Sequence, residues 1–253
     1  MITEATFVRS AASANDLPRD GLAEIAMVGR SNVGKSTLIN ALTRQRVART
    51  SAAPGKTRLA NIYRVVRGGR DPLYLVDLPG YGYARGGKAS AREFDELARI
   101  VFGQVRQVGR VRQVDSSGAF RPASPAPPAL VSALLLVDAR HPGLQSDIEA
   151  WQWVERSVER CAIVATKVDK LARGERIRAL REFESVFEQA VLPVSAATGE
   201  GLDELWKLIE RLRNSSNPPP PPRRNLVPRQ ARDGLSLSKA AGMDKRRHPH
   251  RKS

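Results

Sequence analysis

The apolar positions of this chain form short runs that alternate with helical patterns of period 3.6. Strand-like runs occupy 22–28, 61–66, 73–77, 130–138, 161–165 and 191–194. Helical patterns begin after residue 36 and at 91–108, 145–158, 174–187 and 202–212. This alternation predicts an α/β fold, with a mixed, mostly parallel six-stranded sheet and helices on both faces.

Two further features refine this prediction. The glycine-rich stretch from Gly68 to Asp71 separates two strand-like runs and is typical of a hairpin turn. Residues Thr6–Val8 are a candidate for an additional edge strand. Ligands of such sheets bind at the carboxyl ends of the parallel strands. The polar residues that follow each run are therefore the candidates for ligand binding and catalysis.

Composition shifts divide the chain into three parts. We expect an N-terminal segment at 1–20, an α/β domain at 21–213, and a basic tail at 214–253. Within the domain, the proline-rich stretch 115–129 cannot continue a helix or enter a central strand, so it is predicted to be a disordered surface insertion. Five consecutive prolines at 218–222 form a stiff spacer at the start of the tail, which is otherwise predicted to be disordered.

The charge of the chain points to a polyanionic partner. The net charge is +16 and the pI is near 10.9, and the tail alone has ten Lys and Arg against two Asp. A balance this basic favours nucleic acid or the ribosome as partner over a mere bias of composition. Neither a membrane nor DNA is expected as a partner. Two alternatives stay open. The net charge could reflect an arginine-rich composition of the whole proteome, and the tail could be solvated and have no partner. His248 and His250 belong to this basic arm rather than to a metal site.

Cysteine usage and the absence of targeting patterns suggest a cytoplasmic protein. Cys161 is the only cysteine, which excludes a disulfide within one chain and predicts a small buried apolar residue. The first residues lack a basic segment followed by an apolar core, and no apolar run approaches 18 residues. A monomer is the expected state.

The strongest motif lies between the first strand and the first helix. Gly29 and Gly34 bracket four residues and are followed by Lys35 and Ser36, which is the P-loop pattern in its strand–loop–helix context. The glycines let backbone N–H groups converge on phosphates, and the helix N-terminus adds a partial positive charge. Lys35 supplies a charge for the terminal phosphates, and the Ser36 hydroxyl is a hard ligand for Mg²⁺.

Four later elements complete a nucleotide site, and the first two of them are expected near the phosphates and Mg²⁺. Thr57, in the polar loop 44–58, can close over the γ-phosphate and reach the same Mg²⁺, although an ordinary loop threonine is an equal alternative. Asp77-Leu78-Pro79-Gly80 follows a strand, so that the Asp77 carboxylate can orient Mg²⁺ through water and the Gly80 N–H can bond the γ-phosphate.

The remaining motifs select the base. In Thr166-Lys167-Val168-Asp169, the Asp169 carboxylate can accept two hydrogen bonds from guanine, which adenine cannot donate. The Lys167 stem can lie over the base. Ser195-Ala196-Ala197 follows the last strand, where backbone N–H groups can meet the guanine O6.

Together, the segments GRSNVGKS, PGKTR, DLPGYGYA, LLLVDARH and TKVD resemble the EngB-type ribosome-biogenesis GTPases of the Era-like translation-factor class. The resemblance runs from about residue 5 to 212. It implies a single Ras-like GTPase domain that acts in assembly of the large ribosomal subunit, with a link to cell division and septation. It also implies Mg²⁺ ligands at Ser36 and Thr57, GTP or GDP as ligand, and a large-subunit precursor or its rRNA as partner.

The positions that match the family's nucleotide contacts are Gly29, Arg30, Ser31, Asn32, Val33, Gly34, Lys35, Ser36, Thr37, Gly55, Lys56, Thr57, Arg58, Leu59, Asp77, Leu78, Pro79, Gly80, Thr166, Lys167, Val168, Asp169, Ser195, Ala196 and Ala197. Four of them are expected to act in catalysis: Lys35, Thr57, Gly80 and Asn32. The insertion 115–129 and the tail depart from the family pattern.

Two residues bear on the rate of hydrolysis. Tyr81 stands where many GTPases have a water-orienting glutamine, so intrinsic hydrolysis is expected to be slow and to require a partner. Asn32 matches an asparagine that helps hold K⁺ near the phosphates in related GTPases, and such a cation could replace an arginine finger. A turn residue is an equal alternative for Asn32.

These observations favour an enzyme that hydrolyses GTP to GDP and phosphate and acts as a nucleotide switch. The alternative is an RNA-binding scaffold whose nucleotide is mainly structural. Asp169 disfavours a third possibility, an ATP-using P-loop enzyme.

Overall fold

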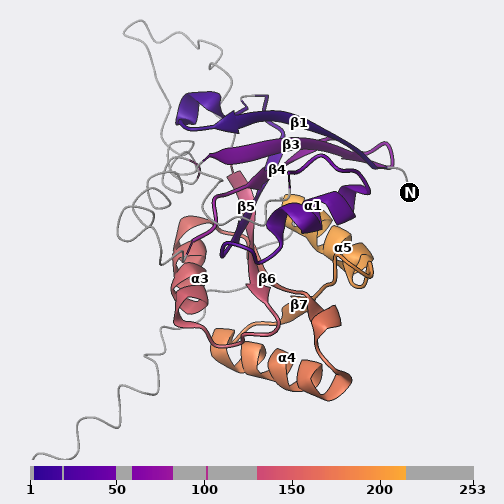
Figure 1. Cartoon of the computed structure of the whole chain (residues 1–253). Coiled ribbons are helices and arrows are strands. Elements are labelled where there is room, and N and C mark those ends of the chain that lie inside the picture. Colours follow the sequence, from indigo (N-terminus) through magenta and orange to yellow (C-terminus); the bar gives the residue numbers. More distant parts are fainter. Residues whose placement is uncertain (1–2, 19, 50–58, 82–100, 102–129, 215–253) are drawn as a thin grey trace, which may run out of the picture. The chain divides into compact units, whose positions relative to one another are not determined.

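The computed structural model describes residues 3–18, 20–49, 59–81, 101 and 130–214 (Figure 1). Contacts divide the chain into two units, Met1–Pro218 and Pro219–Ser253, and all described residues belong to the first. The predicted insertion at 115–129, the tail beyond Asn214 and the predicted helix at 91–108, except Val101, lie outside the described residues. The domain bounds therefore stay predictions.

The described residues form one seven-stranded sheet in the order β1-β3-β4-β2-β5-β6-β7. The strands are β1 (Thr3–Ala11), β2 (Ala23–Gly29), β3 (Ala60–Arg67), β4 (Leu73–Asp77), β5 (Leu130–Asp138), β6 (Cys161–Thr166) and β7 (Val191–Pro193). The helices are α1 (Lys35–Thr43), α3 (Gln145–Ser157), α4 (Arg173–Phe187) and α5 (Leu202–Arg213). Two short 3-10 helices span Ala14–Asp16 and Val168–Lys170.

The mixed, mostly parallel sheet is confirmed, with one strand more than the six predicted. β1 pairs antiparallel with β3, from Thr3 opposite Arg67 to Ala11 opposite Ala60, and a register shift falls between Phe7 and Arg9. The predicted hairpin joins β3 to β4 through Gly68 and Gly69, both at positive φ, and Arg70 N–H donates to Arg67 O at 3.2 Å. From β4 through β7 the neighbouring strands are parallel.

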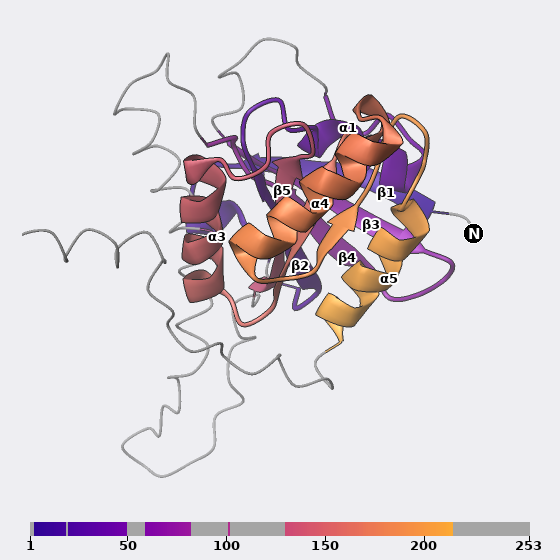
Figure 2. The same cartoon turned by 90° about the horizontal axis from the view of Figure 1, so that it is seen from below.

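Two apolar clusters lie on opposite faces of the sheet (Figures 1 and 2). On one face, Trp151 of α3 and Phe183 and Phe187 of α4 pack against the central strands. On the other, Leu38 and Ile39 of α1 pack with residues of α5. The central strands are buried on both sides because their sequences are almost wholly apolar, which is the pattern of a parallel sheet covered by helices.

This arrangement brings the carboxyl ends of β2, β4, β5, β6 and β7 to the same edge of the sheet, because parallel strands share one direction. The loops that follow these strands carry the predicted motifs. Cys161, predicted to be buried, is partly buried at the other end of β6, and burial raises the pKa of its thiol to about 12.

Within the described part of the chain, we find no helix that combines the length and the apolar character needed to cross a membrane.

Candidate nucleotide-binding site

The loop between β2 and α1 has the backbone shape that its glycines predict. Gly34 lies at φ 109°, and α1 begins at the next residue. A Cβ on Gly29 would lie 2.8 Å from Val33 Cγ1 and 2.9 Å from Leu136 O, so only glycine fits between the loop and β5. Asn32 also lies in the left-handed region at φ 63°. The loop therefore curls tightly over the N-terminus of α1.

Lys35 lies folded under this loop. Its Nζ donates to Gly29 O at 2.9 Å and to Arg30 O at 3.3 Å, and the residue is buried. Burial lowers the pKa of the ammonium, although the nearby Asp77 charge opposes this shift. An ammonium held against two carbonyl oxygens in a buried place lacks an anionic partner of full charge within bonding distance in the described residues. A phosphate would supply one.

Ser36 and Asp77 meet across the site. Ser36 Oγ donates to Asp77 Oδ2 at 2.9 Å, which joins the first turn of α1 to the end of β4. Desolvation raises the pKa of the Asp77 carboxyl, and Lys35 and Ser36 oppose this. The other oxygen, Oδ1, is buried and has no hydrogen-bond partner among the described residues.

This donor set fits Mg²⁺. A hydroxyl and a buried carboxylate with one unpaired oxygen are hard oxygen ligands, and an unpaired buried oxygen is costly without a cation or water. Thr57, the second predicted ligand, lies outside the described residues, as do Gly55, Lys56 and Arg58. Leu59, at the edge of that segment, is exposed.

The segment that follows β4 packs directly on the P-loop. Ser31 N–H donates to Tyr81 O at 3.3 Å, and a Cβ on Gly80 would lie 2.4 Å from Ser31 N. Leu78 N–H donates to Met27 O at 3.2 Å. Because no side chain fits at Gly80, the backbone of this segment can approach whatever the P-loop holds. The γ-phosphate contact expected of Gly80 stays a prediction.

The Tyr81 side chain is largely buried and contacts the first turn of α3. Its phenol donates to Asp147 Oδ1 at 3.0 Å, and Arg30 Nε lies 3.1 Å from the same oxygen. Asp147 is in the first turn of α3 and is buried, and desolvation raises the pKa of its carboxyl while Arg30 opposes the shift. Sequence reasoning did not identify Asp147, because one acid in the first turn of a helix is an ordinary feature.

A second group of charges joins β5 and β6 to the P-loop. Lys167, at φ 60°, donates through Nζ to Asn32 O and, at 2.9 Å, to Asp138 Oδ2. Arg140 donates to both oxygens of Asp138, at 2.9 and 2.7 Å. Burial alone would raise the pKa of Asp138, but these hydrogen bonds outweigh it and hold that pKa well below its usual range. The segment LLLVDARH contains Asp138 and Arg140, but no role followed from sequence.

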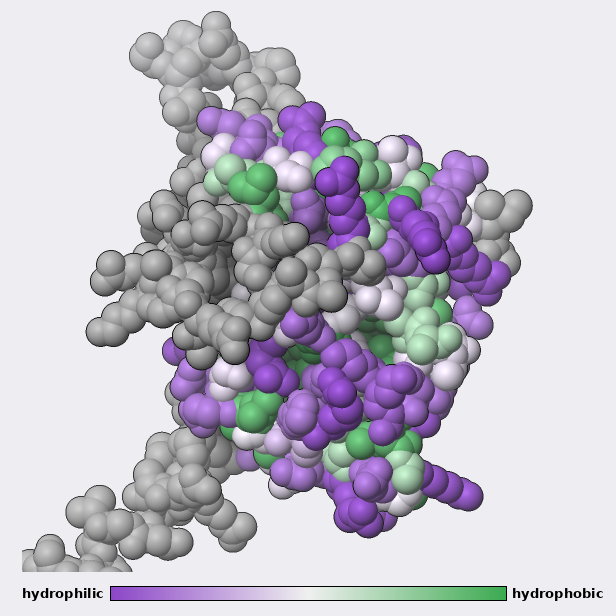
Figure 3. Space-filling model, in the orientation of Figure 1, coloured by the Kyte–Doolittle hydropathy of each residue, from purple (hydrophilic) through white to green (hydrophobic). Residues whose placement is uncertain are grey.

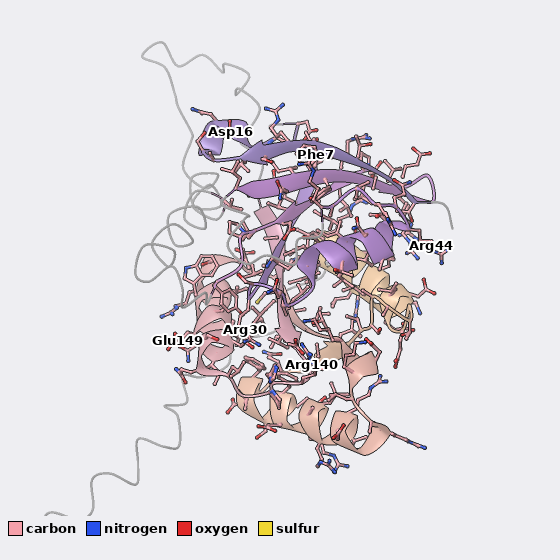
Figure 4. All side chains as sticks on the ribbon, in the orientation of Figure 1. Phe7, Asp16, Arg30, Arg44, Arg140 and Glu149 are labelled. Atoms are coloured by element: carbon pink, nitrogen blue, oxygen red, sulfur yellow. The ribbon has the colours of Figure 1, made fainter. Side chains whose placement is uncertain are left out.

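The side chain of Thr166 also contacts the P-loop. Thr166 Oγ1 lies 2.7 Å from Val33 O and 3.1 Å from Val137 O, and the residue is buried at the end of β6. In Figure 4, the labelled Arg30 and Arg140 lie at the same end of the sheet, after β2 and β5. The end of β6 is therefore fixed to the loop that is predicted to hold the phosphates.

The predicted base-selecting acid is held in place by a neighbour. Ser195 Oγ donates to Asp169 Oδ1 at 2.6 Å, and this hydrogen bond lowers the pKa of the Asp169 carboxyl. Asp169 Oδ2 lies 3.4 Å from Lys170 Nζ, and 13% of the Asp169 side chain is exposed. Ser195 is buried, and Ala196 and Ala197 follow it toward the surface. The Ser195 side chain thus has a role that sequence reasoning gave only to the backbone.

The chain resembles known GTP-binding proteins in sequence. Residues 24–122 match a family model described as a 50S ribosome-binding GTPase. The chain is 40% identical over 212 residues to a protein of Chlorobaculum tepidum named "Probable GTP-binding protein EngB", covering 83% of this chain and 97% of the relative. A protein of the same name from Clostridium acetobutylicum is 37% identical, over 81% and 92%.

Solved structures agree on the fold. A crystal structure described as a probable GTP-binding protein EngB has a TM-score of 0.53 and 22% identity, covering 75% of this chain and 98% of that one. Era of Aquifex aeolicus bound to GDP and aluminium fluoride has a TM-score of 0.57 and 22% identity, over 79% and 60%. An Era complex with MgGDPNP and nucleotides 1506–1542 of 16S ribosomal RNA also has a TM-score of 0.57, at 22% identity over 78% and 59%.

Proposed function

The chain belongs to the EngB family of GTP-binding proteins, and from this premise we propose that it is a GTP-hydrolysing switch in assembly of the large ribosomal subunit. The observation that carries this proposal is the convergence of Lys35, the Ser36–Asp77 pair and the Asp169–Ser195 pair at the loops after β2, β4, β6 and β7. The match of residues 24–122 to a 50S ribosome-binding GTPase model supports the ribosomal role. The link to cell division and septation rests on the family resemblance alone.

In this proposal the P-loop residues 29–36 bind the phosphates of GTP, and Lys35 exchanges its two carbonyl partners for phosphate oxygens. Ser36 and Thr57 would hold Mg²⁺, with Asp77 acting through water; the ion supplies positive charge against the phosphates when bound. Gly80 N–H contacts the γ-phosphate, and Gly55–Leu59 and Asp77–Gly80 respond to its loss.

The base is bound on the far side of the P-loop. Asp169 accepts the N1–H and amino hydrogens of guanine, and Ser195 holds the carboxylate in position. Lys167 lies against the P-loop backbone at Asn32, between the phosphate and base subsites. A preference for guanine follows because adenine would leave a carboxylate unpaired.

Hydrolysis is proposed to be slow without a partner. Phosphoryl transfer depends on positioning and on charge stabilisation, and the residue after Gly80 does not provide a group to orient water. Tyr81 donates its hydroxyl to Asp147 instead. Lys35 and a K⁺ ion held with Asn32 would stabilise charge, and the ribosomal particle would complete the site.

The test is co-sedimentation of the full chain with purified large ribosomal subunits in GDP and in a non-hydrolysable GTP analogue. We expect tighter binding with the analogue. Equal binding in both nucleotides would contradict a switch. A Lys35→Ala variant that loses GTP binding yet keeps full subunit binding and cellular function would instead favour the scaffold alternative.

A further inference from the structure

The loop that follows α1 presents three arginines to solvent. Arg44, Arg46 and Arg49 are all exposed, and none of their guanidinium groups has a hydrogen bond or ion pair with another described residue. Between Glu24 and Asp71 the sequence has no acidic residue and ten Lys and Arg. Three other cations of this stretch, Arg30, Arg67 and Arg70, pair with acids of other elements. The loop arginines differ from them because they have no such partner among the described residues.

The backbone of this loop is fixed, although its arginines are free. The Asn40 carboxamide donates to Ala48 O at 2.8 Å and accepts from Ala48 N–H at 2.8 Å. Gln45 N–H donates to Asn40 O, and Trp206 Nε1 of α5 donates to Leu42 O at 3.2 Å. A fixed backbone with unpaired cations is preorganised for an anion, because little further ordering is needed on binding.

The loop is also joined to the edge strand of the sheet. Gln45 Nε2 donates to Thr3 O at 3.1 Å, and Gln45 Oε1 accepts from Ala5 N–H at 3.3 Å. Phe7 is the next residue on the same face of β1 as Ala5. Phe7 is 47% exposed as a residue, and its ring lies 5.8 Å, centroid to centroid, from that of Tyr63. Figure 4 labels Phe7 on β1 and Arg44 beyond the end of α1.

Other exposed arginines of the domain differ in their surroundings. On α4, Arg173, Arg178 and Arg181 are exposed, but the same helix carries Glu175, Glu182 and Glu184. In the view of Figure 3, hydrophilic side chains cover much of the described surface, with smaller hydrophobic patches between them. Exposure and charge alone therefore do not distinguish the loop from α4. The loop differs from α4 because its own sequence has no acidic residue, its backbone is fixed and an aromatic ring lies on the strand to which it is bonded.

We propose that Arg44, Arg46, Arg49 and Phe7 form an RNA-docking surface, on which the guanidinium groups bind backbone phosphates and the Phe7 ring stacks on an unpaired base. This inference rests on the proposed ribosomal function and gives it a location on the folded domain, separate from the tail. Guanidinium groups suit phosphate oxygens, and aromatic rings suit bases splayed from RNA loops. An acidic protein would satisfy the arginines but would leave the exposed ring without its partner.

The test compares matched variants in binding to purified large ribosomal subunits and to naked rRNA extracted from them, as a function of KCl concentration. The loop variant is Arg44→Gly, Arg46→Ala and Arg49→Ala in one chain. Glycine is chosen at 44 because Arg44 ends α1 at φ 55°, where glycine is favoured, so the fold is preserved. The control variant, Arg173→Ala, Arg178→Ala and Arg181→Ala, removes the same charge from α4.

For the loop variant, the slope of log K against log salt should flatten by about one per lost phosphate contact. At 0.1 M salt, affinity for naked rRNA should fall on the order of a hundredfold. The α4 variant should stay within about twofold of the wild type, and both variants should bind GTP as the wild type does. Phe7→Ala should weaken binding about fivefold with an unchanged slope, because stacking releases no counterions.

Equal losses in the loop and α4 variants would overturn the proposal, because total charge alone would then explain binding. A loop variant that no longer binds subunits but still binds naked rRNA as the wild type does would also overturn the proposal, in favour of a ribosomal protein as partner. Should the wild type bind naked rRNA through the loop but ignore subunits, the docking surface stands and the ribosomal function fails. Absence of binding to both RNA and subunits would reject both.

Discussion

The phenol of Tyr81 donates a hydrogen bond of 3.0 Å to Asp147 Oδ1, although 66 positions separate the two residues. Arg30 of the P-loop reaches the same oxygen at 3.1 Å. The residue after the Asp77–Gly80 motif is thereby held by α3 and by the P-loop together. The hydroxyl of Tyr81 is therefore already engaged within the domain.

Replacing Tyr81 by Phe separates the structural role of the hydroxyl from a catalytic one. We expect the free energy of unfolding to fall by about 1–2 kcal/mol, because Asp147 loses a donor in a buried place. The single-turnover rate of intrinsic GTP hydrolysis should change less than about twofold. Urea unfolding and single-turnover assays measure the two effects.

Tyr63→Phe is the matched control for this change. Tyr63 is also buried, but its hydroxyl makes no hydrogen bond with the residues that the structure describes. The Tyr63→Phe change should alter the free energy of unfolding by less than about 0.5 kcal/mol. A tenfold loss of hydrolysis in Tyr81→Phe would show that the phenol acts on the reaction, against the geometry seen here.

Asp169→Asn should change the base preference of the site. An amide can donate where the carboxylate only accepts, so affinity for GTP should fall by at least about a hundredfold and affinity for xanthosine triphosphate should rise. Calorimetry with both nucleotides in Mg²⁺ measures this. If GTP affinity were unchanged, Asp169 would not be the residue that contacts the base.

The Ser195 hydroxyl is expected to act through Asp169. Ser195→Ala removes the 2.6 Å hydrogen bond and should lower GTP affinity about five- to tenfold without a gain for xanthosine triphosphate. Ser185→Ala on α4, an exposed position, is the matched control and should have no effect on nucleotide affinity.

The elements with continuous apolar runs were predicted well from sequence. Leu73–Asp77 and Leu130–Asp138 have the predicted bounds because central strands are buried on both faces and end where a polar residue is needed. The edge strand β1 was only a candidate at Thr6–Val8, where the strand is exposed on both faces and no alternation of burial marks it. Its pairing with β3 depends on backbone groups, which the sequence does not distinguish.

The motifs of the candidate site were recognisable because each combines a strand end with a short pattern. Asp147 and Asp138 were not recognisable from the sequence, because their roles depend on contacts with residues that are distant along the chain. Asp147 becomes notable only where α3 brings it to Arg30 and Tyr81. Asp138 does so only where Arg140 and Lys167 both donate to it.

Asn32 leads to a prediction about monovalent cations. Its positive φ of 63° shapes the P-loop, and its carbonyl accepts from Lys167, which leaves the side-chain amide exposed on the loop. If the amide oxygen helps hold K⁺, hydrolysis should be several-fold faster in K⁺ than in Na⁺. Asn32→Gly keeps the backbone conformation accessible and should abolish the difference. Equal rates of the wild type in both salts would assign Asn32 to the turn alone.

The basic tail can be tested separately from the folded domain. Removing residues 215–253 leaves Asn214, whose carbonyl accepts from Arg160, at the end of the domain. The truncated chain should bind naked rRNA more weakly and with a flatter salt dependence, because all of the tail's excess positive charge is lost. GTP affinity should not change. A salt slope equal to that of the full chain would mean that the tail does not contact RNA.

Glu24 makes stability depend on pH in a direction opposite to that of most carboxylates. The residue is 1% exposed, Oε1 has no hydrogen-bond partner in the described ranges, and burial, aided by the charge of Asp20, raises its pKa to about 8. Tyr74 also faces it, and its hydroxyl donates to Asp20. Between pH 4.5 and 8 the folded chain therefore holds a proton at Glu24 that the unfolded chain has released.

Because the unfolded state binds fewer protons in this window, Glu24 reduces the free energy of unfolding as pH rises, by up to about 1.4 kcal/mol per unit. Glu24→Gln, which has nearly the same shape and cannot ionise, should remove this slope. Its stability relative to the wild type should therefore be greater at pH 8.5 than at pH 5, as measured by urea unfolding. Glu4→Gln, an exposed change on β1, controls for the lost charge and should give a difference independent of pH. If the difference in free energy of unfolding between Glu24→Gln and the wild type were also independent of pH, Glu24 would be ionised in the folded chain.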